Sequence, residues 1–497
     1  MITRELMAPL MFGGLVVFML IGYPVAFSLA AVGLFFGFIG IELGFFQFAL
    51  LQALPERVFG ILSNELLLAI PFFTFMGAIL ERCGLAEDLL EGMGQLFGPV
   101  RGGLAYAVIV VGAILGAITG TVAASVIAMG LISLSVMMRY GYDMRLATGV
   151  IAASGTITQL IPPSLVLVIL ADQLGRSVGD MYAGAIGPSI VQVLLFCIYI
   201  AVLSIIRPNA MPALPPEART LRGTALLAKV MWGMVPSLVL IFLVLGTIFL
   251  GLATPTEAGA MGAVGALALA AMHRRLTWPL LHQGLATTMR ITAMVIYILI
   301  GSTVFSLVFR GVDGDLWLEG LLTSLPGGVV GFLIVVNLFV FFLAFFLDFF
   351  EIAFIIIPLL APVAQKLGID LIWFGVLLGA NMQTSFMHPP FGLALFYLRG
   401  IAPKEVKSSD IYWGAVPWVG LQVMLVAILI YWPGLVTDFV PRHESIDPAK
   451  VDIQLEEPER GTAGEPTASG ETPAAQSGAS QEDDAASDIQ RQFKSGR

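Results

Sequence analysis

Long uncharged apolar runs follow one another along most of the chain. About 20 apolar residues are enough to cross the hydrocarbon core of a bilayer as a helix. Ten runs predict membrane-spanning helices near 7–23, 25–41, 66–80, 146–173, 181–206, 231–252, 256–272, 291–309, 371–398 and 411–437. The pattern therefore predicts an all-α polytopic membrane protein.

Two further apolar runs, 104–138 and 329–365, are too long for one crossing, and each is interrupted near its centre. The interruptions are ITGT at 118–121 and LDFFE at 347–351. This pattern predicts two re-entrant hairpins, in which a pair of short helices meets at a tip without crossing the membrane.

Adjacent prolines interrupt two of the predicted spans. Pro162 and Pro163 lie in GTITQLIPPS, and Pro389 and Pro390 lie in SFMHPPFG. Proline removes helical hydrogen bonds that lipid cannot replace. We therefore expect both spans to be broken helices rather than plain crossings.

The two halves of the chain share landmarks in the same order. At an offset of 227 residues these are Pro99 and Pro326, GYD at 141–143 and GID at 368–370, and the two proline pairs; after a three-residue insertion, DMYAGA at 180–185 matches DIYWGA at 410–415. The chain is interpreted as an internal duplication. Five crossings per half invert the second half relative to the first, an architecture typical of secondary transporters.

The duplication predicts four parts of the chain. They are a first inverted repeat at 1–206 with its hairpin at 104–138 and broken helix at 146–173, a cytoplasmic linker at 207–230, a second inverted repeat at 231–440 with its hairpin at 329–365 and broken helix at 371–398, and a disordered acidic tail at 441–497. The tail holds twelve acidic and six basic residues, which supply −6 of the formal charge of −9. Its polar composition is typical of a solvated extension.

Composition agrees with a membrane protein. The chain is 58% hydrophobic and 12% charged, whereas soluble domains average about 25% charged residues. We expect the lipid bilayer as its surroundings and no nucleic-acid partner. The cysteines, Cys83 and Cys197, lack metal-site spacing and are read as apolar packing residues.

Loop charges predict the orientation. If the hairpins do not cross, fourteen Lys and Arg residues of the membrane part fall on one side of the bilayer and five on the other. The positive-inside rule places the richer side in the cytoplasm. Both termini are therefore predicted to be periplasmic.

Polar groups at membrane depth gather at the first tip and the first break. The candidates are Thr119, Gly120, Thr121, Ser154, Gly155 and Thr156, with backbone carbonyls freed by Pro162 and Pro163. Hydroxyl and carbonyl oxygens suit a monovalent hard cation such as sodium. The alternative is that small residues here only allow close helix packing; the recurrence of the construction in the second half favours the cation site.

The second half is more polar. Asp348 and Glu351 sit at its hairpin tip, where ionised groups are costly and usually functional; an interfacial tip or a structural pair is the alternative. Four polar residues precede the second proline pair: Asn381, Gln383, Thr384 and Ser385. His388 follows them and is interpreted as a packing residue, with a ligand or proton role as the alternative.

These residues carry a family resemblance. The sequence resembles the large membrane subunit, the DctM-like subunit, of tripartite ATP-independent periplasmic (TRAP) transporters from about residue 7 to residue 440. The matching stretches include RYGYDMRLATGVIAASGTITQLIPPS, SVGDMYAGAIGP, GLATPTEAGAMGA, FFLDFFEIAFIIIPLLAP and LGANMQTSFMHPPFGLALFYLRGIAP.

The resemblance implies a sodium-driven transporter of the bacterial inner membrane. In an elevator-type mechanism, a transport domain of hairpins and broken helices moves against a scaffold. The implied partners are a small membrane subunit of about four helices and a periplasmic protein that delivers an organic acid. Sodium ions are coupled and transported, and no organic cofactor is implied.

Carried over by position, the resemblance implies two sodium sites with the substrate between the tips. The implied sodium-binding residues are Thr119, Gly120, Thr121, Gly155, Thr156, Pro162, Asp348, Asn381, Thr384 and His388. The implied substrate-binding residues are Thr121, Ser154, Asp348, Glu351, Gln383 and Ser385. The chain departs from the family in having His388 where threonine is common, and TGTVAAS where the first hairpin is often serine-rich with a nearby acid.

Three other functions are alternatives to a sodium-driven transporter subunit. A proton-coupled or binding-protein-independent carrier would use His388, Asp348 and Glu351 as a relay. A membrane enzyme acting on lipids would need clustered acids or a nucleophile beside a base, and the sequence shows neither pattern, so the chain is not expected to be an enzyme. A passive channel does not explain paired inverted hairpins.

Overall fold

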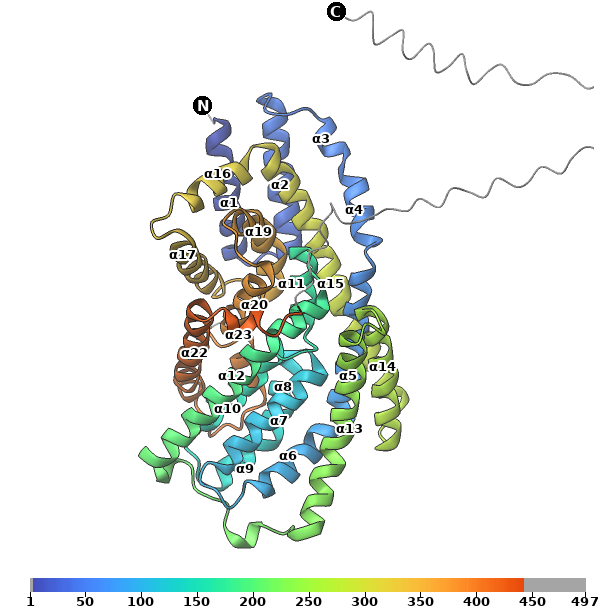
Figure 1. The fold of residues 1–497 in the computed structure, drawn as a ribbon, viewed down its shortest axis with the longest axis vertical. Coiled ribbons are helices and arrows are strands. Elements are labelled where there is room, and N and C mark those ends of the chain that lie inside the picture. The colour runs from blue at the N-terminus through green and yellow to red at the C-terminus, as the bar shows by residue number, and fades with distance from the viewer. Residues whose placement is uncertain (1–2, 391, 442–497) are drawn as a thin grey trace, which may run out of the picture. The chain divides into compact units, whose positions relative to one another are not determined.

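The computed structural model describes residues 3–390 and 392–441, and every regular element in these ranges is a helix (Figure 1). Seven of these helices are long and apolar enough to cross a membrane, or up to nine if each of two bent pairs is one span. The all-α polytopic class is confirmed. Apart from residue 441, the predicted acidic tail lies outside the described residues.

The first half consists of two N-terminal helices, a bent helical segment, an amphipathic helix, an interrupted pair of helices, a broken helix and a long final helix. Its helices are α1 (Arg4–Ile21), α2 (Val25–Glu42), α3 (Ala49–Gln52), α4 (Leu54–Leu62), η1 (Glu65–Leu68), α5 (Ala69–Arg82), α6 (Leu85–Leu96), α7 (Gly103–Thr119), α8 (Val122–Met129), η2 (Gly130–Leu134), α9 (Ser135–Arg139), α10 (Met144–Thr156), η3 (Ile157–Gln159), α11 (Leu165–Leu174) and α12 (Val178–Ile206). Two short 3-10 turns, η4 (Pro208–Ala210) and η5 (Pro216–Ala218), follow in the linker.

The second half gives a similar succession of elements, with one long continuous helix in place of the bent segment of the first half. Its helices are α13 (Gly223–Phe249), α14 (Pro255–Met272), α15 (Trp278–Gly311), α16 (Gly314–Thr323), α17 (Gly328–Leu343), α18 (Phe349–Glu351), η6 (Ile352–Ile356), α19 (Ile357–Lys366), α20 (Leu371–Met382), η7 (Gln383–Phe386), α21 (Leu393–Ile401), α22 (Ser408–Tyr431) and α23 (Gly434–Thr437). α8 and α18, and likewise α10 and α20, begin 227 residues apart. The inverted orientation of the halves stays a prediction.

Both long apolar runs are interrupted at their predicted centres. α7 ends at Thr119, and Gly120 takes a left-handed φ of 63° before α8 begins. In the second run α17 ends at Leu343, and Asp348 is the N-cap of the next helix. A residue with φ above zero ends a helix at little cost only when it is glycine, so the first tip follows from Gly120.

Each proline pair separates two helices. α10 passes into the 3-10 turn η3 and stops before Pro162 and Pro163, and α11 begins after the N-cap Ser164, whose side chain accepts a hydrogen bond from Val166 N. The second pair lies in the same way between η7 and α21. Both Pro-Pro bonds are cis.

The two halves are packed into one another. α2 packs on α15, and α5 packs on α14. In both contacts a helix of the first half meets a helix of the second half. A Cβ on Gly33 would lie 3.0 Å from the backbone of Phe305, and one on Gly301 would lie 2.3 Å from the carbonyl oxygen of Ala26. Only glycine permits helices to approach this closely.

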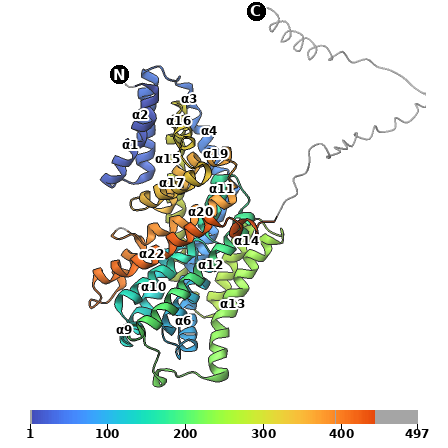
Figure 2. The same cartoon turned by 60° about the vertical axis from the view of Figure 1, so that its left-hand side comes forward.

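The long helix that follows each break, α12 or α22, packs on the broken helix of the other half. α10 runs beside α22, and α12 packs on α20 (Figure 2). A Cβ on Gly149 would lie 2.3 Å from the carbonyl oxygen of Gly414, so the α10 and α22 backbones are nearly in contact. The broken helices of both halves therefore meet helices of the opposite half.

Some boundaries differ from the prediction. α6 was not predicted, because its sequence LAEDLLEGMGQL is amphipathic rather than apolar; it packs on α7 and α13. α15 begins at Trp278, well before the predicted start at 291, because Thr277 acts as its N-cap: the Thr277 side chain accepts a hydrogen bond from Leu280 N, and Pro279 stands in the first turn. The predicted linker at 207–230 ends as helix, since α13 begins at Gly223.

Candidate functional site

Both arms of the first hairpin, α7 and α8, pack closely against the first broken helix. A Cβ on Gly116 of α7 would lie 3.0 Å from Thr158 Cα, and a Cβ on Gly155 of α10 would lie 3.2 Å from Val126 N of α8. The predicted residues Thr119 and Thr156 are both buried. Small residues thus do allow close packing here, as the alternative interpretation expected, and the same packing brings hairpin and break together.

Most hydroxyls of the first site have hydrogen-bond partners within the protein. Thr119 Oγ1 donates to Leu115 O and lies 2.9 Å from Ser125 Oγ. Thr156 Oγ1 donates to Ala153 O and accepts a 2.8 Å hydrogen bond from Gln422 Nε2. These oxygens keep lone pairs for a cation, but they are oriented by the fold rather than free.

Two residues of the first break have a buried side-chain oxygen without a hydrogen-bond partner in the part of the chain that the structure describes. These oxygens are Ser154 Oγ and Gln159 Oε1. The Gln159 carbonyl, which Pro163 leaves without its helical donor, accepts a 2.6 Å hydrogen bond from Ser164 Oγ. An unpaired buried oxygen is costly, so Ser154 is a suitable ligand for a cation or a substrate group.

The acids of the second tip form a capping box. Asp348 Oδ1 accepts from Glu351 N, and Glu351 Oε2 accepts from Asp348 N, each at 3.0 Å. This arrangement satisfies donors at the start of the helix that follows the tip. Both carboxylates therefore have a structural role, and each retains a second oxygen.

The polar residues before the second proline pair are also buried. Asn381 Nδ2 donates to Asn337 O at 2.7 Å and to Asn337 Oδ1 at 3.0 Å, which fastens the broken helix α20 to the hairpin arm α17. Thr384 and Ser385 hydroxyls donate to carbonyls of their own helix. The sequence reasoning missed Asn337, although a lone asparagine in an apolar run is a signal of this kind.

A cavity of about 390 Å³ joins part of the predicted substrate site. Asp348, Glu351 and Ser385 line it, together with Met19 of α1 and the apolar residues around them. Thr121, Ser154 and Gln383, which were assigned to the substrate by resemblance, are not in its lining. The structure therefore gathers the second tip and second break around one cavity.

His388 packs in an aromatic slot. Its ring stacks on Phe345 with centroids 4.0 Å apart and meets Phe341 edge-on at 4.5 Å. It is buried, and within residues 3–390 and 392–441 neither ring nitrogen has a hydrogen-bond partner. His388 is not in the lining of the cavity that Asp348 and Glu351 share. The ring contacts fit the packing interpretation, whereas two unpaired buried nitrogens fit the ligand interpretation.

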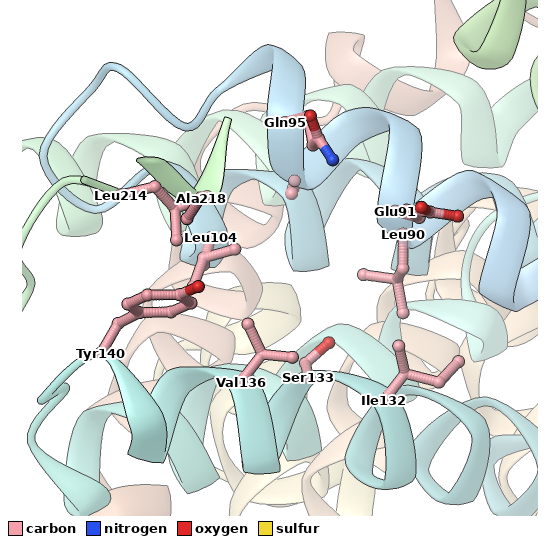
Figure 3. Close-up of a pocket in the computed structure, with 12 residues that line it drawn as sticks. Leu90, Glu91, Gln95, Leu104, Ile132, Ser133, Val136, Tyr140, Leu214 and Ala218 are labelled. Atoms are coloured by element: carbon pink, nitrogen blue, oxygen red, sulfur yellow. The ribbon is translucent and has the colours of Figure 1, made fainter. Parts of the chain in front are cut away.

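A second cavity, of about 200 Å³, lies away from these residues between α6, α7, the second arm of the first hairpin and the linker (Figure 3). Figure 3 shows Gln95 and Glu91 of α6 above Tyr140 and Ser133. Gln95 ties the linker down: its Nε2 donates to Thr220 Oγ1, and its Oε1 accepts from Leu221 N. None of the predicted site residues lines this cavity.

Comparison with known proteins gives one consistent answer. The family described as "Tripartite ATP-independent periplasmic transporter, DctM component" matches residues 12–435. The C4-dicarboxylate TRAP transporter large permease protein DctM of Pseudomonas aeruginosa is 29% identical over 385 residues, which are 77% of this chain and 88% of that protein. The sialic acid TRAP transporter large permease protein SiaM of Vibrio cholerae is 29% identical over 416 residues, 83% of this chain and 93% of that protein.

A solved structure supports the fold. The YdaH transporter of Alcanivorax borkumensis, described as having an unusual topology, superposes with a TM-score of 0.58 over 79% of this chain and 90% of that one, at 15% sequence identity. At this identity the likeness concerns the fold alone. Because the family match covers nearly all of the described helices, this chain belongs to the DctM family, the large permease subunits of tripartite ATP-independent periplasmic transporters.

Proposed function

We propose that this subunit imports a small organic acid together with sodium ions. As a TRAP large permease the chain is a transporter subunit rather than an enzyme, and the coupling ion and the substrate are what the proposal adds. The observation that carries it is the cavity at the second tip: among the residues that the structure describes, its lining holds two carboxylates and no basic side chain.

The charge of this cavity favours a cation as co-substrate. Two like unit charges about 5 Å apart repel by about 3 kcal/mol at an effective dielectric constant of about 20. Whenever Asp348 and Glu351 are ionised, an organic anion that enters beside them would meet this repulsion from each of them. A bound cation offsets it, and the oxygen-only ligands of the tips and breaks suit sodium.

Relatives support the substrate class. Proteins similar to this chain are named for C4-dicarboxylates, isethionate and sialic acid. All are organic anions of small or moderate size. We therefore expect a carboxylate or sulfonate as substrate, bound between the two tips.

The tripartite family supports two partners: a small membrane subunit and a periplasmic protein that delivers the substrate. The proposed location is the bacterial inner membrane with both termini in the periplasm, on the basis of the loop charges. The hairpins and broken helices would form the moving part, and α1, α2 and α13–α15 the scaffold.

Uptake into proteoliposomes tests the proposal. The complete transporter, with its small subunit and substrate-loaded binding protein, should accumulate substrate under an inward sodium gradient. An equal potassium gradient is the control. Uptake that is unchanged without sodium would reject the coupling, and uptake driven by a pH gradient alone would instead support proton coupling through the acids of the second tip.

A further inference from the structure

Two buried glutamines connect the broken helices across the halves. Gln422 lies on α22, in the second half. Its Nε2 donates a hydrogen bond of 2.8 Å to Thr156 Oγ1 at the first break. Gln192 lies on α12, in the first half. Its Nε2 donates a hydrogen bond of 2.6 Å to Gln383 Oε1 at the second break. All four side chains are at most 1% exposed.

The two contacts occupy corresponding positions. Gln383 matches Thr156 at the offset of 227, and Gln422 matches Gln192 at the offset of 230 that follows the three-residue insertion. The helix after each break therefore crosses to the break of the other half. Such a reciprocal pair differs from one isolated buried hydrogen bond, because the same geometry is made twice with different acceptors.

Each contact falls where the backbone is least regular. Thr156 is the last residue of α10 before the 3-10 turn η3, and Gln383 is the first residue of η7. A proline pair then removes two further amide donors. Side-chain contacts from a neighbouring continuous helix are thus well placed to fix the course of the break.

The glutamines are not part of a closed polar network. Gln192 Oε1, Gln422 Oε1 and Gln383 Nε2 are buried and have no hydrogen-bond partner among the described residues. Burying an amide with half of its capacity unused costs free energy that leucine would not. The N–H contact to the break is the interaction that these side chains provide.

We infer that Gln192 and Gln422 are positioning residues, each of which holds the break of the opposite half in the conformation that binds the coupling cation. The inference rests on the proposed sodium coupling. It makes each cation site depend on a helix of the opposite half.

The test measures sodium binding by the purified full-length protein. The midpoint sodium concentration for thermal stabilisation is determined at constant ionic strength, with potassium as the replacement ion. Gln192→Leu and Gln422→Leu should each raise this midpoint about tenfold, the ratio that corresponds to about 1.4 kcal/mol. Ser237→Ala is the matched control, because Ser237 is equally buried but bonds only to Gly233 O of its own helix.

The outcomes separate the two proposals. Unmoved sodium midpoints in both variants, with a normal sodium response in the unaltered chain, would overturn the positioning role alone. No sodium-specific response in the unaltered chain would overturn the proposed coupling, and the inference with it. Should the leucine variants not fold, Gln192→Met and Gln422→Met replace them; failure of all four while Ser237→Ala folds would identify a purely structural role and overturn the inference.

Discussion

Substitutions of Asp348 can distinguish its structural role as a helix cap from its proposed role in binding a cation. It caps the helix after the second tip and also lines the cavity. Asparagine is as good an N-cap as aspartate, whereas alanine loses about 1 kcal/mol at such a position. Asp348→Asn therefore removes the charge and keeps the cap, and Asp348→Ala removes both.

The expected magnitudes differ for the two roles. A carboxylate about 5 Å from a cation contributes about 3 kcal/mol at an effective dielectric constant of about 20, which is on the order of 100-fold in a binding midpoint. We expect Asp348→Asn to raise the sodium midpoint by this order without changing the unfolding temperature in potassium. Asp348→Ala should change both quantities.

The assay is thermal unfolding of the purified protein across a sodium titration. Glu351→Gln is the companion variant, since glutamine also completes a capping box while the other charge of the same cavity is removed. An unchanged sodium midpoint in Asp348→Asn would refute the reasoning and leave Asp348 a cap only. A fall in its unfolding temperature equal to that of Asp348→Ala would refute the capping argument.

Three further changes test the packing of the site. Gly77→Ala should lower sodium-dependent uptake and thermal stability, because its Cβ would lie 2.0 Å from Thr119 O at the first tip, whereas Gly60→Ala meets nothing within 4 Å and should be neutral. His388→Phe should retain sodium-dependent uptake if the aromatic slot serves packing, and its loss would indicate an imidazole function. Asn337→Leu should destabilise the protein by about 1–3 kcal/mol, read from thermal unfolding, because it removes one acceptor of a buried amide; an unchanged unfolding temperature would contradict the contact.

The proline breaks and the interruptions of the two long apolar runs were predictable because they oppose their surroundings. Prolines 162 and 163, and Gly120 between two threonines, conflict with a continuous span in lipid, and the sequence pattern registers that conflict directly. The second interruption and the second break carry the same kind of signal in LDFFE and in Pro389–Pro390, and the 227-residue offset relates them to the first. Local rules of helix formation were sufficient for these features.

The contacts inside the site were not predictable in the same way. Gln422 reaches a residue 266 positions earlier, and Gln192 reaches one 191 positions later, and no local pattern specifies such a partner. Asp348 and Glu351 were recognised as unusual, but their mutual capping depends on backbone geometry at the tip. The aromatic slot of His388 likewise requires the hairpin arm to be placed first.

The crossed packing of the halves has a consequence for biosynthesis. α2 enters the membrane with its glycine face ready, but its partner segment around Phe305 is made roughly 270 residues later, which at about 5–20 residues per second is on the order of 10–50 s. Until then the faces of α2 and α5 have only lipid or an insertion factor to cover them. Slowing translation between the halves should therefore lengthen the period in which the nascent chain is vulnerable to membrane proteases.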